Sequence, residues 1–224
     1  VSCKNCCEKK HRNGDVTYYH QMLGASLVHP EEKVVIPLAP EPIIKSDGAK
    51  KNDCERNVSK RLLTDLRREH PHLKILIVED GLASNYPHLS LLDSLKMNYV
   101  IGAKPGDHTY LFDWIKDLPA KTHSQCDDHG VQHHFKFYDD VPLNDAHYEY
   151  RVNVVEYTEI HKSGKQQHFS WVTKIPVTEK NVFEIMKAGR SRWKIENETF
   201  NTLKNQGYNF EHNYGHGSEH LCST

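Results

Sequence analysis

The most constraining feature of this sequence is the largely apolar run Leu-Lys-Ile-Leu-Ile-Val at residues 73–78, which ends in Glu79, Asp80 and Gly81. A short apolar run that ends at turn residues is typical of a strand buried on both faces of a sheet. Open α/β sheets bind their ligands at the carboxyl ends of such strands. Asp80 is therefore the first candidate functional residue.

Predicted strands and helices alternate around this run. Helices are expected at residues 54–70, 89–97 and 109–116. A second buried strand is expected at 99–103, and two β-rich runs at 16–28 and 34–44 are interpreted as antiparallel neighbours joined by a turn. This order of elements predicts an α/β fold, with a mixed sheet flanked by helices.

The composition changes after residue 120. Residues 121–134 are polar and predict a loop, and they are followed by three β-rich segments at 135–138, 148–160 and 167–177. The dipeptide Ser163-Gly164 predicts a hairpin turn. These segments predict an antiparallel β insertion that interrupts the α/β core. The expected parts are the first part of the core at 1–120, the insertion at 121–178, and a helical segment with its tail at 179–224.

A second candidate lies in the helical pattern of residues 179–204, where Gly189 predicts a break. On a helical projection one face carries Trp193, Glu196, Phe200 and Leu203. Its aromatic residues are expected to pack in the core. A carboxylate buried without a partner is costly, so Glu196 requires a cation or a metal ion. Two alternatives meet this requirement. Arg192, one turn earlier, would form an ion pair with Glu196, or Asp80 would be a second carboxylate that binds a metal ion.

The charge composition does not indicate a nucleic-acid protein. The formal net charge is −1, so any phosphate contacts must come from a local basic patch. The helix predicted at 54–70 offers such a patch, and its alternative is a solvated helix face. The patch contains Lys60, Arg61, Arg67 and Arg68.

The start of the chain and its apolar content guide the expected location. No run is long enough to span a bilayer and no leader pattern opens the chain, which predicts a cytoplasmic protein. Val1 stands where a start methionine would be, so a piece of a longer chain is expected.

Cysteine and histidine residues allow metal-binding interpretations. Cys3 and Cys6, with His11 and His20 nearby, have spacing that allows a tetrahedral zinc site. The alternative is a set of reduced thiols near a hairpin. Two other groups have ligand-like spacing but no predicted rigid scaffold. They are His123, Cys126, His129 and His133 in the predicted loop, and His212, His216 and His220 in the tail.

The pattern R-x-R-W-x-I-E-x-x-x-F-x-x-L-K at residues 190–204 is followed by Gly-Tyr. It resembles the C-terminal signature of DDE insertion-sequence transposases, closest to the IS-four-like group. Residues 12–43, 76–81 and 207–217 are also similar to members of this family. The resemblance implies an RNase H-like core that carries a β insertion before its last catalytic helix.

By this resemblance, Asp80 and Glu196 match the second and third catalytic carboxylates, which hold Mg²⁺ or Mn²⁺. Arg192 and Lys204 match the basic residues that flank the Glu and face DNA phosphates. Two departures concern this region. Gly189 stands where the family commonly has a Tyr, and seven residues separate Glu196 from Lys204, one more than usual.

The implied activity is Mg²⁺-dependent cleavage and strand transfer of DNA at transposon ends. The implied partners are the transposon ends and target DNA, with a homodimer on DNA, no membrane, and a bacterial, nucleoid-associated location. In the family an aromatic residue of the insertion can stack on a flipped base. Trp171 holds such a position, with packing on the sheet as the alternative.

The first catalytic Asp of the family has no counterpart in this sequence. Asp15 lies at a predicted turn, and Asp47 and Asp53 lie in a polar loop. We therefore expect this chain to be an incomplete, inactive fragment of an active enzyme. Two alternatives are an RNase H-like nuclease and a zinc-stabilised DNA-binding remnant without catalysis.

Overall fold

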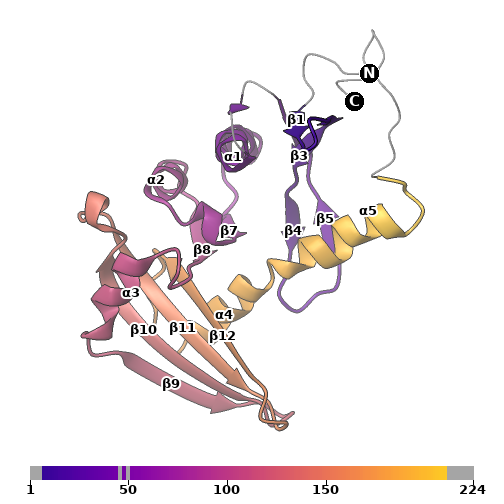
Figure 1. The fold of residues 1–224 in the computed structure, drawn as a ribbon. Coiled ribbons are helices and arrows are strands. Elements are labelled where there is room, and N and C mark those ends of the chain that lie inside the picture. The colour runs from indigo at the N-terminus through magenta and orange to yellow at the C-terminus, as the bar shows by residue number, and fades with distance from the viewer. Residues whose placement is uncertain (1–6, 45–46, 49–50, 211–224) are drawn as a thin grey trace. The chain divides into compact units, whose positions relative to one another are not determined.

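The computed structural model describes residues 7–44, 47–48 and 51–210 (Figure 1). The chain divides into two compact units, one formed by Val1–Pro71 with Trp193–Thr224 and the other by His72–Arg192. Of the helices in the described ranges, none combines the length and the apolar character that a membrane span requires.

A six-stranded mixed sheet forms the unit His72–Arg192, with strand order β7-β8-β12-β11-β10-β9. The strands are β7 (Leu76–Glu79), β8 (Asn98–Gly102), β9 (Lys121–Cys126), β10 (Gln132–Pro142), β11 (Arg151–Ile160) and β12 (Gln166–Thr173). β7 and β8 are parallel, and every other neighbouring pair is antiparallel. The predicted mixed sheet is confirmed. The residues predicted to form an insertion continue this sheet, because β12 pairs directly with β8.

Three helices flank the sheet: α2 (Tyr86–Ser94), α3 (Thr109–Lys116) and α4 (Val182–Arg190). α4 contacts β7 and β8, and its Val182, Ile185 and Met186 join a core cluster with aromatic and aliphatic residues of the sheet. α2 contacts β8, and α3 contacts β10 (Figure 1). The helix predicted at 109–116 is confirmed with the same bounds. α2 begins earlier than predicted because the Asn85 side chain accepts a hydrogen bond from the His88 amide and caps it.

β7 differs from the predicted strand buried on both faces. Leu76 is 42% exposed, because β7 is the end strand of the sheet and, in the described ranges, pairs only with β8. β8 does match its prediction. Tyr99, Val100 and Ile101 are fully buried between α2 on one side and α4 on the other.

The prediction of a loop at residues 121–134 is wrong. These residues form β9, a turn and the start of β10, which pair in an antiparallel hairpin. His133 and Phe135 are buried on the inner face, while His134 and Lys136 are exposed on the other. The low apolar content of the exposed face concealed the alternation of a half-buried strand.

The break predicted near Gly189 is found close by, because α4 ends at Arg190 and Gly189 lies in its last turn. A Cβ atom at Gly189 would lie 2.5 Å from the Nε1 and Cε2 atoms of Trp171. Gly189 therefore allows α4 to approach the sheet closely. Trp171 is 4% exposed, so its indole packs between the sheet and the helix as the alternative interpretation held.

The second unit contains α1 (Lys51–Glu69) and three antiparallel strand pairs. The pairs are β1 (Cys7–Lys10) with β2 (Val16–Tyr19), β3 (Gln21–Leu23) with β6 (Glu41–Ile43), and β4 (Ser26–Val28) with β5 (Val35–Pro37). The predicted pairing of 16–28 with 34–44 is confirmed, although both runs are broken into short strands. Ile43, Cys54 and Val58 form a small core where α1 packs on β3 and β6.

Substitution of Gly189 by Ala is expected to lower the free energy of unfolding by about 1–3 kcal/mol. The added methyl group would overlap the Trp171 indole, and this cost exceeds the gain in helix propensity. Urea unfolding followed by circular dichroism measures the change. Gly106→Ala is the matched control, because a Cβ atom there has no neighbour within 4 Å. Equal stability of the two variants would contradict the proposed packing.

Candidate functional site

Asp80 follows the last residue of β7 and lies at the carboxyl end of the parallel β7–β8 pair. Its side chain is exposed, and its Oδ1 atom accepts a hydrogen bond of 3.0 Å from the Leu82 amide. This contact caps the 3₁₀ turn Gly81–Ala83. The carboxylate is thus held at a strand tip with its outer part accessible to solvent.

Gly102, at the end of β8, lies against the backbone of Asp80 and Gly81. A Cβ atom on Gly102 would lie 3.4 Å from the Gly81 nitrogen and 3.6 Å from the Asp80 carbonyl carbon. The end of β8 and the turn after β7 are therefore in close contact. A Cβ atom at Gly102 would make ordinary van der Waals contact with this turn.

Sequence reasoning missed an acid–histidine pair beside Asp80. The Glu79 Oε2 atom lies 2.6 Å from the Nε2 atom of His88, which is buried in the first turn of α2. The pair ties the end of β7 to α2, and so supports the turn that presents Asp80. No local motif signals this contact, because nine residues and a turn separate the partners.

Glu196 lies in the other unit, on the π-helical segment Ile195–Phe200, which leads into α5 (Asn201–Asn205). The π-helical segment contacts β5. The Thr199 Oγ1 atom lies 3.4 Å from Ser26 Oγ, and Lys194 Nζ donates to the carbonyl oxygens of His29 and Glu32. These contacts fix the segment on the β4–β5 hairpin, and the Glu196 side chain there is half-buried.

The π-helical segment changes the face predicted from a regular α-helix. Hydrogen bonds to the fifth residue widen each turn, so positions spaced for an α-helix no longer coincide. Trp193 is 51% exposed, which contradicts the expectation that it packs in the core. Lys204 is exposed on α5, and Arg192 is half-buried at the end of the sheet unit.

The basic residues of α1 differ in their accessibility. Lys60 is exposed and donates to Asn57 Oδ1 on the same helix. Arg67 Nη1 donates to the carbonyl oxygens of His70 and Pro71, just beyond the end of the helix. Arg68 forms an ion pair of 2.6 Å with Asp65. The predicted patch is therefore partly neutralised by local contacts.

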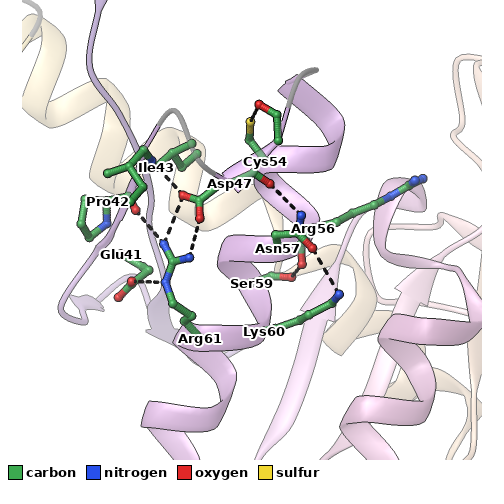
Figure 2. Close-up of polar contacts among 12 residues, drawn as sticks. Glu41, Pro42, Ile43, Asp47, Cys54, Arg56, Asn57, Ser59, Lys60 and Arg61 are labelled. Atoms are coloured by element: carbon green, nitrogen blue, oxygen red, sulfur yellow. Dashed lines mark hydrogen bonds and ion pairs between the residues drawn. The ribbon is translucent and has the colours of Figure 1, made fainter. Parts of the chain in front are cut away.

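Arg61 has an internal structural role (Figure 2). Its Nη1 atom donates to Asp47 Oδ1 at 2.6 Å, and its Nε atom donates to Glu41 Oε1 at 2.7 Å. Its Nη2 atom donates to the Pro42 carbonyl oxygen at 3.1 Å. The guanidinium group thus fastens α1 to β6 and to the residues that follow it. Two carboxylates already neutralise Arg61, so we no longer expect it to contact DNA.

Asp47 is the buried acceptor of this cluster. The hydrogen bond from Arg61 is the largest influence on its carboxyl group and lowers its pKa. Burial acts in the opposite direction, and a hydrogen bond from the Ile44 amide adds to the lowering. Asp47 was predicted to lie in a polar loop, but it is a buried ion-pair partner.

The metal-binding predictions have unequal support. In the described ranges, no group of three or more His, Cys, Asp or Glu residues is arranged to hold a metal ion. His123, Cys126, His129 and His133 are all described, and no three of them are gathered at one point. Cys3 and Cys6 of the predicted zinc site lie outside the described residues, as do His212, His216 and His220. His11 contacts Thr17 Oγ1 at 2.8 Å.

Comparison with known proteins gives no family for this chain. No family model matches the sequence, and no curated protein matches it.

Arg61→Ala is expected to lower the free energy of unfolding by about 2–3 kcal/mol, because it leaves the buried Asp47 carboxylate without its main donors. The control is Lys60→Ala on the same helix, which is expected to change stability by no more than about 0.5 kcal/mol. Urea unfolding measures both. A loss for Arg61→Ala no larger than that of the control would show that the ion-pair cluster is not structural.

The lowered pKa of Asp47 predicts a dependence of stability on pH. A carboxyl group with a lowered pKa in the folded state stabilises the protein above its unfolded pKa of about 3.9, and this contribution is lost as the pH falls through the folded pKa. Wild-type protein is therefore expected to be more stable than Asp47→Asn at neutral pH, with the difference shrinking below about pH 4. Asp65→Asn is the control on α1. A difference that does not depend on pH would contradict the assignment.

Proposed function

We propose that this chain is part of the catalytic region of a DNA transposase of the DDE class, with its mixed sheet forming an RNase H-like core. The complete enzyme would cleave DNA at transposon ends and join it to target DNA. The main support is the position of Asp80, an exposed carboxylate at the carboxyl end of a strand in the parallel β7–β8 pair. Open α/β sheets bind ligands at such strand ends.

Asp80 and Glu196 are the proposed ligands of Mg²⁺ or Mn²⁺. These hard cations prefer oxygen ligands, and an exposed carboxylate at a strand tip fits that preference. When bound, the ions supply a Lewis acid that polarises a phosphodiester and favours attack by water or a 3′ hydroxyl. The protein's own contribution at Asp80 is a fixed position, set by the Leu82 amide and by the contact between Gly102 and Gly81.

Lys204, Arg192 and Lys60 are the proposed phosphate contacts. Lys204 and Lys60 are exposed, and Lys60 lies on the solvent side of α1. Arg61 is excluded by its two carboxylate partners. DNA binding through these residues would weaken with rising salt concentration, since each phosphate contact releases counterions.

Two of the carboxylates before β7 already take part in local contacts. Asp47 is engaged by Arg61, and the Asp15 carboxylate accepts a hydrogen bond from the Asn13 side chain in the β1–β2 turn. We propose that Asp80 and Glu196 each contribute to metal binding, and that strand transfer requires a third carboxylate for which the described residues give no counterpart. The zinc site at Cys3 and Cys6 remains a prediction.

Metal binding by the chain itself tests the proposal. Asp80→Asn and Glu196→Gln are each expected to weaken Mn²⁺ binding by about tenfold or more, because each removes a charged oxygen ligand. Electron paramagnetic resonance of free Mn²⁺ measures the affinity. Asp107→Asn, in the turn after β8, and Glu198→Gln, two residues after Glu196, are matched controls with exposed side chains. Wild-type affinity in Asp80→Asn would sink the proposed site.

A further inference from the structure

A row of aromatic rings lies on the surface of the sheet unit, where α3 meets the segment between β10 and β11. Tyr110 and Trp114 are one turn apart on α3, with their ring centroids 5.9 Å apart. The Trp114 ring lies edge to face with the Tyr148 ring, at 5.6 Å between centroids. Trp114 and Tyr148 are 36% and 39% exposed. These three residues form the aromatic row.

Packing of the sheet unit does not account for the exposure of Trp114. The buried residues of α3 are Leu111, Phe112 and Ile115, and Trp114 is not one of them. Within the part of the chain that the structure describes, the Trp114 indole N–H donates no hydrogen bond. Trp, Tyr and Arg are the residue types most enriched at binding hot spots, and exposed apolar side chains gathered together mark interaction sites. The aromatic row is therefore a candidate binding surface.

The protein itself shows what these rings attract. The guanidinium carbon of Arg151 lies 4.2 Å from the centroid of the Tyr148 ring, and Lys174 Nζ lies 4.2 Å from that of Tyr150. The face of an aromatic ring is negative and attracts cations, most strongly when the ring is the indole of Trp. In the described ranges no Lys or Arg lies over Trp114, so the strongest acceptor of the row is without a cation.

The charges around the aromatic row are mainly acidic. The segments 113–118 and 145–151, which carry Trp114 and Tyr148, contain four acidic and two basic residues. Both bases are already engaged, Lys116 by an ion pair on α3 and Arg151 by the neighbouring ring. Three exposed carboxylates form no ion pair in the described ranges, namely Asp117, Asp145 and Glu149. This surface would repel a phosphate group and attract a cationic partner.

We propose that the aromatic row binds an Arg-rich segment of a partner protein, with one guanidinium group stacked on the Trp114 indole and other Arg side chains paired with the surrounding carboxylates. Arg suits this surface better than Lys, because its planar guanidinium group stacks on aromatic rings and is more weakly hydrated than an ammonium group. The Trp114 indole N–H would donate to a backbone carbonyl oxygen of the bound segment. The proposal does not depend on the metal site at Asp80 and Glu196.

Binding of a short peptide of repeated Arg-Gly-Gly to the chain, measured by isothermal titration calorimetry, tests the proposal. Trp114→Ala is expected to weaken binding by about tenfold, which is the effect of losing a cation–π contact that is partly removed from water. Trp193→Ala is the matched control, because Trp193 is more exposed than Trp114 and belongs to the other unit. Equal affinities of the two variants for the peptide would overturn the proposal.

A charge variant keeps the proposal testable if Trp114→Ala folds poorly. Asp117→Asn combined with Glu149→Gln changes only exposed side chains and is expected to weaken peptide binding by about threefold. Asp128→Asn combined with Glu198→Gln removes the same net charge outside the aromatic row and is expected to leave the affinity unchanged. A peptide with citrulline in place of each Arg has a similar shape but no charge, and it should not bind. Equal affinities of the two double variants, or binding of the citrulline peptide, would contradict the proposal.

Two further measurements distinguish an Arg-rich segment from other occupants of the aromatic row. In sedimentation velocity, a dimer that is lost in Trp114→Ala but kept in Trp193→Ala would make the row a contact between two copies of this chain. In a DNA-binding titration, a larger loss for Trp114→Ala than for Trp193→Ala would make it a base-stacking surface. Either result would overturn the proposal, and the absence of both effects is expected.

Discussion

The sheet unit depends on the pairing of β8 with two different neighbours. β8 is parallel to β7 on one edge and antiparallel to β12 on the other, and this joins an α/β crossover to an antiparallel meander. Its central residues are fully buried. Thr173 of β12 reinforces the second pairing, because its hydroxyl donates to the Tyr99 carbonyl oxygen at 2.6 Å. The position of Asp80 at the end of β7, and that of α4 on the sheet, both follow from this strand.

The sequence predicted much of the fold where apolar periodicity was strong. The apolar residues of β8 and α3 and the stripe of α1 were sufficient to predict these elements, but residues 121–134 were misassigned because their inner face alternates with an exposed polar face. Asp80 was found from its place after an apolar run. The sequence also contained an indication of the role of Glu159 that was missed. Glu159 lies on the same inward face of its strand as Val155 and Tyr157, and a carboxylate on a buried face requires a cation.

Long-range ion pairs explain why charged residues were harder to interpret. Arg61 was grouped with other basic residues of one helix, yet its partners Glu41 and Asp47 lie 20 and 14 residues earlier in the chain. Arg190 and Glu159 also form an ion pair between residues far apart in the sequence, with a separation of 31 residues. From the local composition these charged side chains would be expected to be unpaired, whereas in the folded protein they form ion pairs with distant residues. The number of basic groups that are not neutralised is therefore smaller than the composition indicates.

The central claim is that Asp80 and Glu196 act as ligands of the same kind of ion. NMR of the labelled chain with substoichiometric Mn²⁺ tests it most directly, because a bound paramagnetic ion broadens the signals of nearby amides. The account predicts broadening at Gly81 and Leu82 that is lost in Asp80→Asn, and broadening at Asn197 that is lost in Glu196→Gln. Broadening at Gly81 that is unchanged by Asp80→Asn, or absent altogether, would contradict it.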